Sequence, residues 1–186
     1  MKPVILVAHG SPADPDPQDA TLHELACKVG ALLPKHEVRG ATLARDGSLA
    51  CALHGLSDPL IYPFFMAEGW FTKRELPRRL GLLGYEGLRH LPPLGVDPHL
   101  PDLVLQCLHE AAHAADFVPA QTQILLAAHG SKIARNSKDS SYDMAEIIRQ
   151  RGGFKAVHVG LIEEAPFVAE AAKDLGQAMC LPFFAL

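Results

Sequence analysis

The chain has 186 residues, of which 48% are hydrophobic and 20% are charged, so it can bury one sizeable core or two small ones. Its formal net charge of −4 gives no overall attraction for nucleic acid or for an anionic membrane, and neither is expected as a partner. No apolar run approaches the roughly 18 residues of a membrane helix, and the start, Met1-Lys2-Pro3, lacks the apolar segment of a signal peptide. We therefore expect a globular protein of the cytoplasm.

The four cysteines are far apart and form no C-x-x-C pair; they are Cys27, Cys51, Cys107 and Cys180. This spacing argues against a disulfide framework and against a cysteine metal site. We therefore expect these residues to be buried as small hydrophobic side chains.

Short apolar runs rich in Val, Ile and Leu alternate along the chain with segments of helical periodicity. Apolar runs that stop at Gly or Pro are typical of strands buried on both faces, and their alternation with helices indicates parallel sheets. Helical spacing of apolar residues is clear in residues 18–33 and 141–151. The sequence predicts strands near residues 3–9, 37–44, 59–65, 87–91, 123–129, 155–162 and 178–184, with helices in the intervals.

An internal repeat relates two parts of the chain. The apolar run Val4–Ser11 ends in His-Gly-Ser, and Ile124–Ser131 ends in the same way 120 residues later. A second match follows at an offset of 119 residues, where Leu60–Phe65 and Met179–Phe184 both contain Pro-Phe-Phe. Two collinear matches predict two related three-layer α/β halves with parallel sheets, joined near residues 116–123.

The repeat predicts domains at residues 1–118 and 119–186. The second is shorter, because the material that matches residues 67 to about 120 would have to follow Leu186. Either the functional chain is longer than this sequence, or the second half has lost its last helices and strand. The apolar ending favours the first interpretation.

A histidine ends the first predicted strand of each half. Ligands of open parallel sheets bind beyond the carboxyl ends of the strands, so His9 and His129 are expected at a ligand site. A neutral imidazole can bind a divalent transition metal or accept a proton. A single histidine at a strand end is more often structural, but duplication at matching positions favours function. We predict both histidines as metal ligands, His129 as catalytic, and Ser11 and Ser131 as donors to an anionic ligand.

Two adjacent carboxylates, Glu163 and Glu164, end the predicted strand at residues 155–162. They fall at the same sheet edge as His129, and histidine with carboxylate is a competent metal and proton site. We predict both as catalytic. The alternative is that they only open a helix from Ala165, where the helix dipole favours acidic residues.

Basic residues gather after strand ends in an otherwise acidic chain. Such clusters suit a polycarboxylate substrate, although solvated helix faces are the simpler explanation for any single residue. One cluster comprises Lys73, Arg74, Arg78 and Arg79, and the other comprises Lys132, Arg135 and Lys138. From these, the predicted substrate-binding residues are Arg74, Arg78, Lys132, Arg135 and Lys138, together with the two serines.

These residues resemble the class II chelatase family, in particular the long sirohydrochlorin cobalto- and ferrochelatases of cobalamin and siroheme synthesis. The resemblance implies two flavodoxin-like domains that face each other, with a tetrapyrrole and a metal in the cleft between them. It implies insertion of a divalent metal, cobalt or iron with nickel as a further option, into a sirohydrochlorin-type tetrapyrrole. The metal is then a substrate, no organic cofactor is expected, and the protein is expected to be a monomer or a homodimer.

The first half departs from the family pattern at two places. Such proteins carry a second histidine in a Gly-x-His context after the Pro-Phe-Phe strand, whereas this chain has Phe71 there, after Gly69-Trp70. The stretch that parallels the two glutamates contains Ala44 and Arg45 and no carboxylate. We therefore assign the chemistry to the second half.

Two other functions remain as alternatives. His109-Glu110-Ala111-Ala112-His113 matches the H-E-x-x-H signature of zinc hydrolases, but both histidines fall on the polar face of the predicted helix and no third ligand has recognisable spacing. A non-catalytic tetrapyrrole- or metal-binding protein is the other alternative, because the first half has lost ligands. The sequence contains no G-x-S-x-G elbow of a serine hydrolase.

Overall fold

The computed structural model describes residues 2–130 and 139–185. The chain forms two compact units, which divide between Gly95 and Val96. This division follows contacts within the structure. The domain boundary predicted after residue 118 marks where the sequence repeat begins again, and it remains a prediction.

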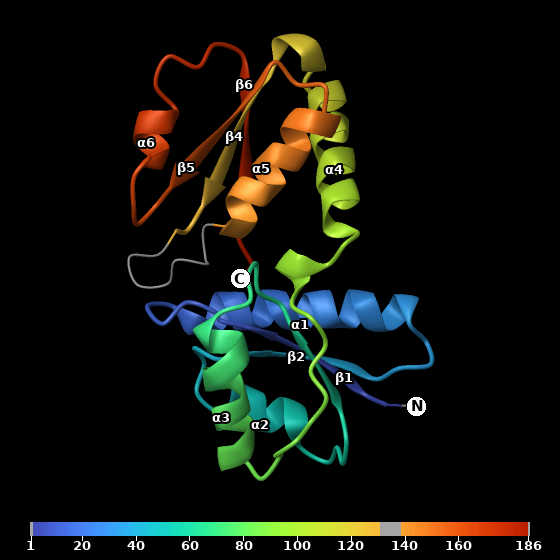
Figure 1. Cartoon of the computed structure of the whole chain (residues 1–186). Coiled ribbons are helices and arrows are strands. Elements are labelled where there is room, and N and C mark those ends of the chain that lie inside the picture. The colour runs from blue at the N-terminus through green and yellow to red at the C-terminus, as the bar shows by residue number, and fades with distance from the viewer. Residues whose placement is uncertain (1, 131–138, 186) are drawn as a thin grey trace. The chain divides into compact units, whose positions relative to one another are not determined.

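The first unit is built on a three-stranded parallel sheet with the order β2-β1-β3 (Figure 1). Its strands are β1 (Val4–Ala8), β2 (Val38–Thr42) and β3 (Leu60–Pro63). Its helices are α1 (Pro15–Leu32) and α2 (Ser48–Leu53), then the π-helical turn η1 (Phe71–Glu75), which runs into α3 (Leu76–Leu82).

Side chains of β1 alternate between two apolar layers. Leu6 and Ala8 pack with Leu22 and Ala26 of α1 on one face. Ile5 and Val7 belong to a second buried cluster with α2 and α3 on the opposite face. Both faces are buried because successive strand residues point to opposite sides, so β1 reads as a continuous apolar run. The first unit is therefore a three-layer α/β/α structure.

The strand predicted at residues 87–91 is wrong as an extended strand. Only a single parallel bridge forms, between Ile61 and His90. The backbone N–H of Ile61 donates to Arg89 O over 3.0 Å, and Leu91 N–H donates to Ile61 O over 2.8 Å. Pro92 and Pro93 follow at once and have no N–H to continue the ladder.

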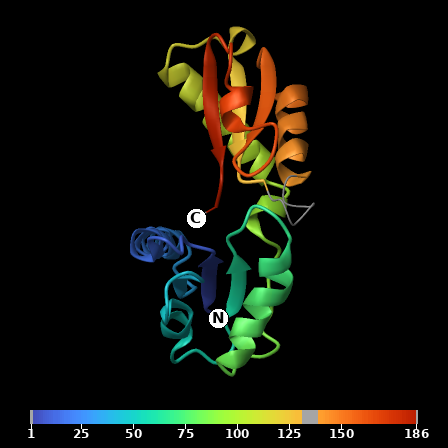
Figure 2. The ribbon, with the colours of Figure 1, turned by 90° about the vertical axis from the view of Figure 1, so that its left-hand side faces the viewer.

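The second unit repeats the arrangement with a three-stranded parallel sheet in the order β5-β4-β6. Its strands are β4 (Gln123–Ala128), β5 (Ala156–Leu161) and β6 (Ala178–Phe183). In Figures 1 and 2, α4 (Leu100–Ala114) and α5 (Asp139–Arg151) lie on one side of this sheet and the short α6 (Val168–Ala171) lies on the other. Two short 3-10 turns, η2 (Leu94–Val96) and η3 (Pro119–Gln121), complete the described elements. No helix in the described part of the chain is both long enough and apolar enough to cross a membrane.

The two sheets share one register. Val7 of β1 lies opposite Pro63, and Ala127 of β4 lies opposite Pro182. These pairs preserve the offsets of 120 and 119 residues that the sequence repeat predicts. The predicted fold, two related parallel α/β halves, is thereby confirmed.

All four cysteines are free thiols and exposed, so their expected burial is wrong. In α1 the buried stripe is held by Leu22 and Ala26, and Cys27 comes one position later on the solvent side. A thiol is small, so its exposure costs little hydrophobic free energy.

Candidate functional site

The carboxyl edge of the second sheet brings one histidine and two glutamates together. His129 is the residue after β4, and Glu163 is the second residue after β5. The backbone N–H of Glu163 donates to His129 O over 3.0 Å, and Ile162 N–H donates to Ala128 O over 3.0 Å. The ladder between β4 and β5 thus continues past the strand ends and fixes the two side chains beside each other.

The side chains of His129 and Glu163 meet at this edge. His129 Nε2 lies 3.3 Å from Glu163 Oε1, and the two side chains are 66% and 46% exposed. A carboxylate can hold an imidazolium by charge, or it can share a metal ion or a proton with a neutral imidazole. Both side chains are accessible, so a ligand that arrives from solvent can reach them.

Glu164 packs against the turn that follows His129. Gly130 has a φ of +72°, and a Cβ at this position would lie 3.2 Å from Glu164 Cγ. Glycine therefore serves both the left-handed turn and the close approach of the glutamate. The alternative that the glutamates open a helix at Ala165 is wrong, because α6 begins at Val168.

Of the site residues predicted at this edge, the structure describes His129, Glu163 and Glu164. In residues 2–130 and 139–185, no cluster of three or more His, Cys, Asp or Glu side chains is arranged to hold a metal ion. The other predicted ligand contacts of this half, Ser131, Lys132, Arg135 and Lys138, lie outside the described residues and remain predictions.

The corresponding edge of the first unit carries His9 in an aromatic setting. His9 Nδ1 lies 2.7 Å from Gly10 O. A carbonyl oxygen can only accept, so the neutral ring that donates here has its proton on Nδ1, and Nε2 of that tautomer has a lone pair for a metal or a proton. The ring also meets Phe71 edge-to-face, with centroids 4.3 Å apart. Phe71 thus supplies an aromatic contact where the family pattern has a second histidine. Ser11, the predicted donor beside it, is half-buried.

Hydrogen bonds at the first edge match those of the second residue by residue. Ala44 N–H donates to His9 O over 2.8 Å, as Glu163 N–H does to His129 O. Ala44 and Arg45 therefore occupy the positions of Glu163 and Glu164. In this register the first unit has no carboxylate at the positions that match Glu163 and Glu164, as the sequence predicts.

Arg45 is held by a buried acid that the sequence analysis missed. Asp19 of α1 is 1% exposed, and its carboxylate accepts hydrogen bonds from Ser48 Oγ, Thr42 N, Thr42 Oγ1 and Arg45 Nη1. Burial alone would raise the pKa of Asp19, but these hydrogen bonds outweigh it and lower the pKa. The sequence does contain a sign that Asp19 is buried. It precedes Leu22 by three residues and so lies on the apolar face of the helix.

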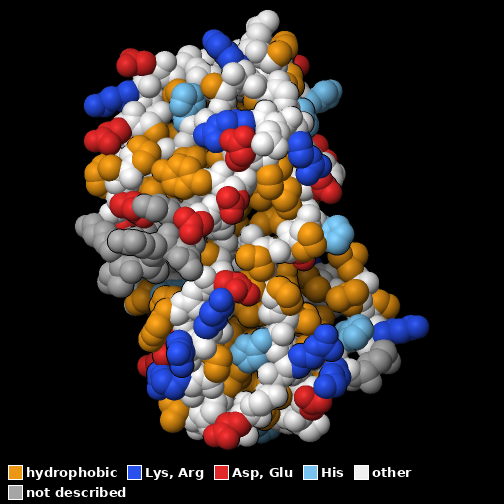
Figure 3. Space-filling view, viewed as in Figure 1, with side chains coloured by type: hydrophobic (Ala, Val, Ile, Leu, Met, Phe, Trp, Pro, Cys, Tyr) orange, Lys and Arg blue, Asp and Glu red, His pale blue; other side chains and the backbone are white. Residues whose placement is uncertain are grey.

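The two basic residues predicted for substrate binding in the first unit differ in their contacts. Arg78 donates from Nε and Nη2 to both oxygens of Glu75, which is itself almost buried. Hydrogen bonds from Arg78 and Arg79 lower the pKa of Glu75 to about 2. Arg74 is exposed and makes no hydrogen bond or ion pair with any described residue. Basic side chains are visible over α3 in Figure 3. Lys73, Arg78 and Arg79 pair with Glu68 or Glu75, so Arg74 is the residue of this cluster that remains for a ligand anion.

The H-E-x-x-H segment in α4 makes other contacts. The His109 ring stacks on Phe154 at a centroid distance of 5.1 Å. Glu110 accepts a hydrogen bond from Gln106 over 2.7 Å. No third metal-ligating side chain joins these residues in the described part of the chain, so the zinc-hydrolase alternative gains no support.

Comparison with known proteins connects this arrangement to one family. The family model described as CbiX matches residues 3–111. The chain is 22% identical to a protein of Halobacterium salinarum named probable sirohydrochlorin cobaltochelatase. The alignment is 213 residues long with its gaps and covers 99% of this chain and 72% of that protein.

Solved structures agree with this family. A CbiX described as the terminal enzyme for biosynthesis of siroheme in denitrifying bacteria is 46% identical, with a TM-score of 0.89 over 100% of this chain and 80% of that chain. SirB from Bacillus subtilis, solved with Fe3+, is 19% identical and has a TM-score of 0.69 over 98% of this chain and 76% of that chain, which shows a shared fold. The resemblance to class II chelatases is confirmed, and the chain belongs to the CbiX family.

Proposed function

We propose that this protein inserts a divalent metal ion, cobalt or iron, into a sirohydrochlorin-type tetrapyrrole. The observation that carries the proposal is the His129–Glu163 pair, 3.3 Å apart at the carboxyl edge of the second sheet in a chain of the CbiX family. Ligands of such sheets bind at this edge. The pair supplies the two chemical groups that metal insertion needs.

The reaction replaces two pyrrole N–H protons by one metal dication. The protein must hold the incoming cation near the macrocycle and accept protons as they leave. In the proposed mechanism the Glu163 carboxylate holds the cation by charge, and the neutral imidazole of His129 ligates it or accepts a proton. Glu164, which packs on the adjacent turn, is the second carboxylate for either task.

The first unit has an auxiliary role in this mechanism. His9 presents Nε2 with its lone pair, since Nδ1 is held by Gly10 O. The positions that match the two glutamates hold Ala44 and Arg45, so His9 has no neighbouring carboxylate of that kind. That His9 and His129 serve one metal and one substrate remains a prediction from the repeat.

Two relatives support the proposed substrate and metal, and they differ in the metal that they suggest. The relative that is 46% identical is described as an enzyme of siroheme biosynthesis, which supports sirohydrochlorin as substrate and iron as metal. The Halobacterium relative is named for cobalt. Imidazole and carboxylate ligands accept several first-row dications, so the ligand set does not choose between them.

Metal insertion into sirohydrochlorin tests the proposal directly. Absorbance distinguishes the free from the metallated macrocycle, and cobalt, iron and nickel should be compared under anaerobic conditions. We expect multiple turnovers with cobalt or iron, and a large loss of rate in Glu163→Gln or Glu164→Gln, whichever carboxylate acts. Absence of insertion by the folded wild-type protein with all three metals would overturn the proposal.

A non-catalytic tetrapyrrole- or metal-binding protein is the second candidate. The observation in its favour is Phe71, which stands against His9 where the family pattern has a second histidine. A carrier binds one equivalent and stops, whereas a chelatase releases the metallated product and continues. Counting product formed per protein molecule therefore separates the two functions.

A further inference from the structure

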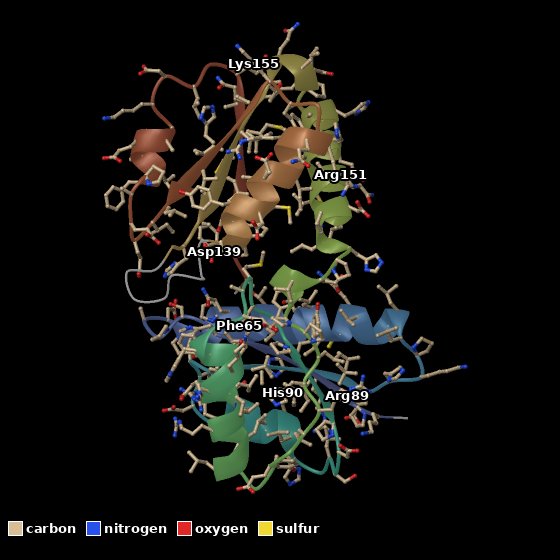
Figure 4. The ribbon with its side chains drawn as sticks, in the orientation of Figure 1. Phe65, Arg89, His90, Asp139, Arg151 and Lys155 are labelled. Atoms are coloured by element: carbon tan, nitrogen blue, oxygen red, sulfur yellow. The ribbon has the colours of Figure 1, made fainter. Side chains whose placement is uncertain are left out.

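An aromatic cluster beside His9 has no role in the metal chemistry proposed above. Phe71 contacts His9, stacks on Phe65 at 6.2 Å and meets Trp70 edge-to-face at 5.1 Å. Figure 4 labels Phe65 beside the first turn of the segment that leads into α3. The cluster therefore extends from the histidine at the sheet edge outward to Trp70.

Trp70 is unusual in its exposure. It is the only tryptophan in the sequence, and it is 58% exposed although tryptophan is among the more buried side chains on average. The turn that carries Trp70 is held by a hydrogen bond. Gly69 N–H donates to Oγ1 of the buried Thr72 over 3.0 Å. An exposed, well-anchored indole is typical of a surface that packs on a flat apolar ligand.

A cation accompanies this flat apolar surface. Arg74 lies four residues after Trp70, about one helical turn further along η1, so both side chains start from the same side of the segment. Arg74 is exposed and makes no ion pair with any described residue, whereas the neighbouring Lys73 pairs with Glu68 at 2.7 Å. A ligand that matches the surface is planar and apolar at its centre and anionic at its rim.

We propose that Trp70, Phe71 and Arg74 form a docking surface for the tetrapyrrole, in which the aromatic rings contact the macrocycle and Arg74 binds a peripheral carboxylate. The inference rests on the proposed function and adds to it the residues of the first unit that contact the macrocycle. Replacement of a histidine ligand by Phe71 is then a change of role, from metal binding to substrate binding.

Binding of metal-free sirohydrochlorin to the full chain tests the docking surface apart from insertion. We expect Trp70→Ala to raise the Kd about 10-fold, the size of one lost aromatic stacking contact, and Trp70→Phe to restore most of the affinity. Arg74→Gln should raise the Kd several-fold and reduce its dependence on salt. In the insertion assay the loss should fall on KM, with kcat close to that of the wild type.

Leu82→Ala is the matched control, because Leu82, at the end of α3, is another large apolar side chain exposed in the first unit, at 74% exposure. It should leave Kd and KM unchanged. An unchanged Kd in Trp70→Ala, in a protein that still inserts metal, overturns the docking surface and leaves the proposed function standing. A wild-type protein that binds no sirohydrochlorin and inserts no metal overturns both. A loss in kcat alone would show that Trp70 acts on the chemistry and would also contradict docking.

Discussion

The two units share strand order, register and the glycine turn after each histidine, yet their sheet edges carry different chemistry. Beside His129 stands Glu163, while the position that matches it beside His9 holds Ala44. Beside His9 stands the ring of Phe71. Duplication has therefore preserved the scaffold, and the functional side chains on it have diverged.

The sheets also differ in how one face is covered. Leu43 follows β2 and is 5% exposed beneath α2 and α3, whereas Ile162, at the matching hydrogen-bonding position after β5, is 53% exposed. Ile61 of β3 is buried, and Cys180 at the matching position of β6 is exposed. The described part of the second unit contains no counterpart of α3. Apolar sequence alone does not bury a residue; a covering element is needed.

The sharpest way to break the comparison is to remove each histidine in turn. His129→Ala should slow metal insertion by about 10²–10⁴-fold, the usual size of a lost general acid–base group, because the imidazole adjoins Glu163. His9→Ala should slow metal insertion less, because Ala44 occupies the position beside His9 that corresponds to Glu163. Initial rates at saturating sirohydrochlorin and metal measure both.

Circular dichroism of both variants provides the control for folding. An active His129→Ala protein beside an inactive, folded His9→Ala protein would reverse the assignment and place the chemistry in the first unit.

The buried acid of the first unit gives the next largest effect, on stability. Asp19→Ala removes the acceptor of four hydrogen bonds from Thr42, Ser48 and Arg45 and should destabilise the protein by about 3–5 kcal/mol. Thermal and urea unfolding measure the loss. Asp16→Ala is the matched control: Asp16 also pairs with Arg45, but it is 78% exposed, so its loss should cost less than about 1 kcal/mol. Equal losses in the two variants would show that burial of Asp19 is unimportant.

The covered sheet face of the first unit and the exposed one of the second predict a third, smaller difference, in the stability lost when one apolar side chain is removed. Leu43→Ala opens a cavity beneath two helices and should cost about 2–4 kcal/mol. Ile162→Ala removes a side chain that is already half in solvent and should cost about 0.5 kcal/mol. Unfolding curves of the two variants, recorded under the same conditions, check this. A large loss in Ile162→Ala would show that its face is covered in solution.

Most of the fold follows from the sequence because buried parallel strands and their flanking helices leave strong local patterns. The repeat of His-Gly-Ser and Pro-Phe-Phe also predicts the register that pairs Val7 with Pro63 and Ala127 with Pro182. The strand predicted at residues 87–91 is reduced to one bridge, because Pro92 and Pro93 follow directly and have no N–H to continue the ladder. The exposure of the cysteines depends on which neighbours cover them, and no local pattern encodes this.

The candidate site was less accessible to prediction. His129, Glu163 and Glu164 could be placed at one edge because strand ends of a parallel sheet meet there. The indole of Trp70 and the carboxylate of Asp19 were missed, because their roles depend on contacts between distant segments. Arg78 shows the same limit, since its ion pair with Glu75 distinguishes it from Arg74 although both look alike in sequence.

The smallest expected effect concerns pH and the Glu75 ion pairs of the first unit. Glu75 has a folded-state pKa of about 2 against an ordinary value of 4.5, because Arg78 and Arg79 donate hydrogen bonds to its carboxylate. A lowered pKa of an acid stabilises the folded state fully above pH 4.5, and this contribution is lost as the pH falls from 4.5 to about 2. Glu75→Gln should therefore lower the melting temperature at pH 7, and its difference from the wild type should shrink across that window. Glu68→Gln is the control, because the Glu68–Lys73 pair is exposed and should contribute little at any pH. A Glu75→Gln difference that stays constant from pH 7 to pH 2 would show that packing of the side chain, rather than its charge, is what the first unit requires.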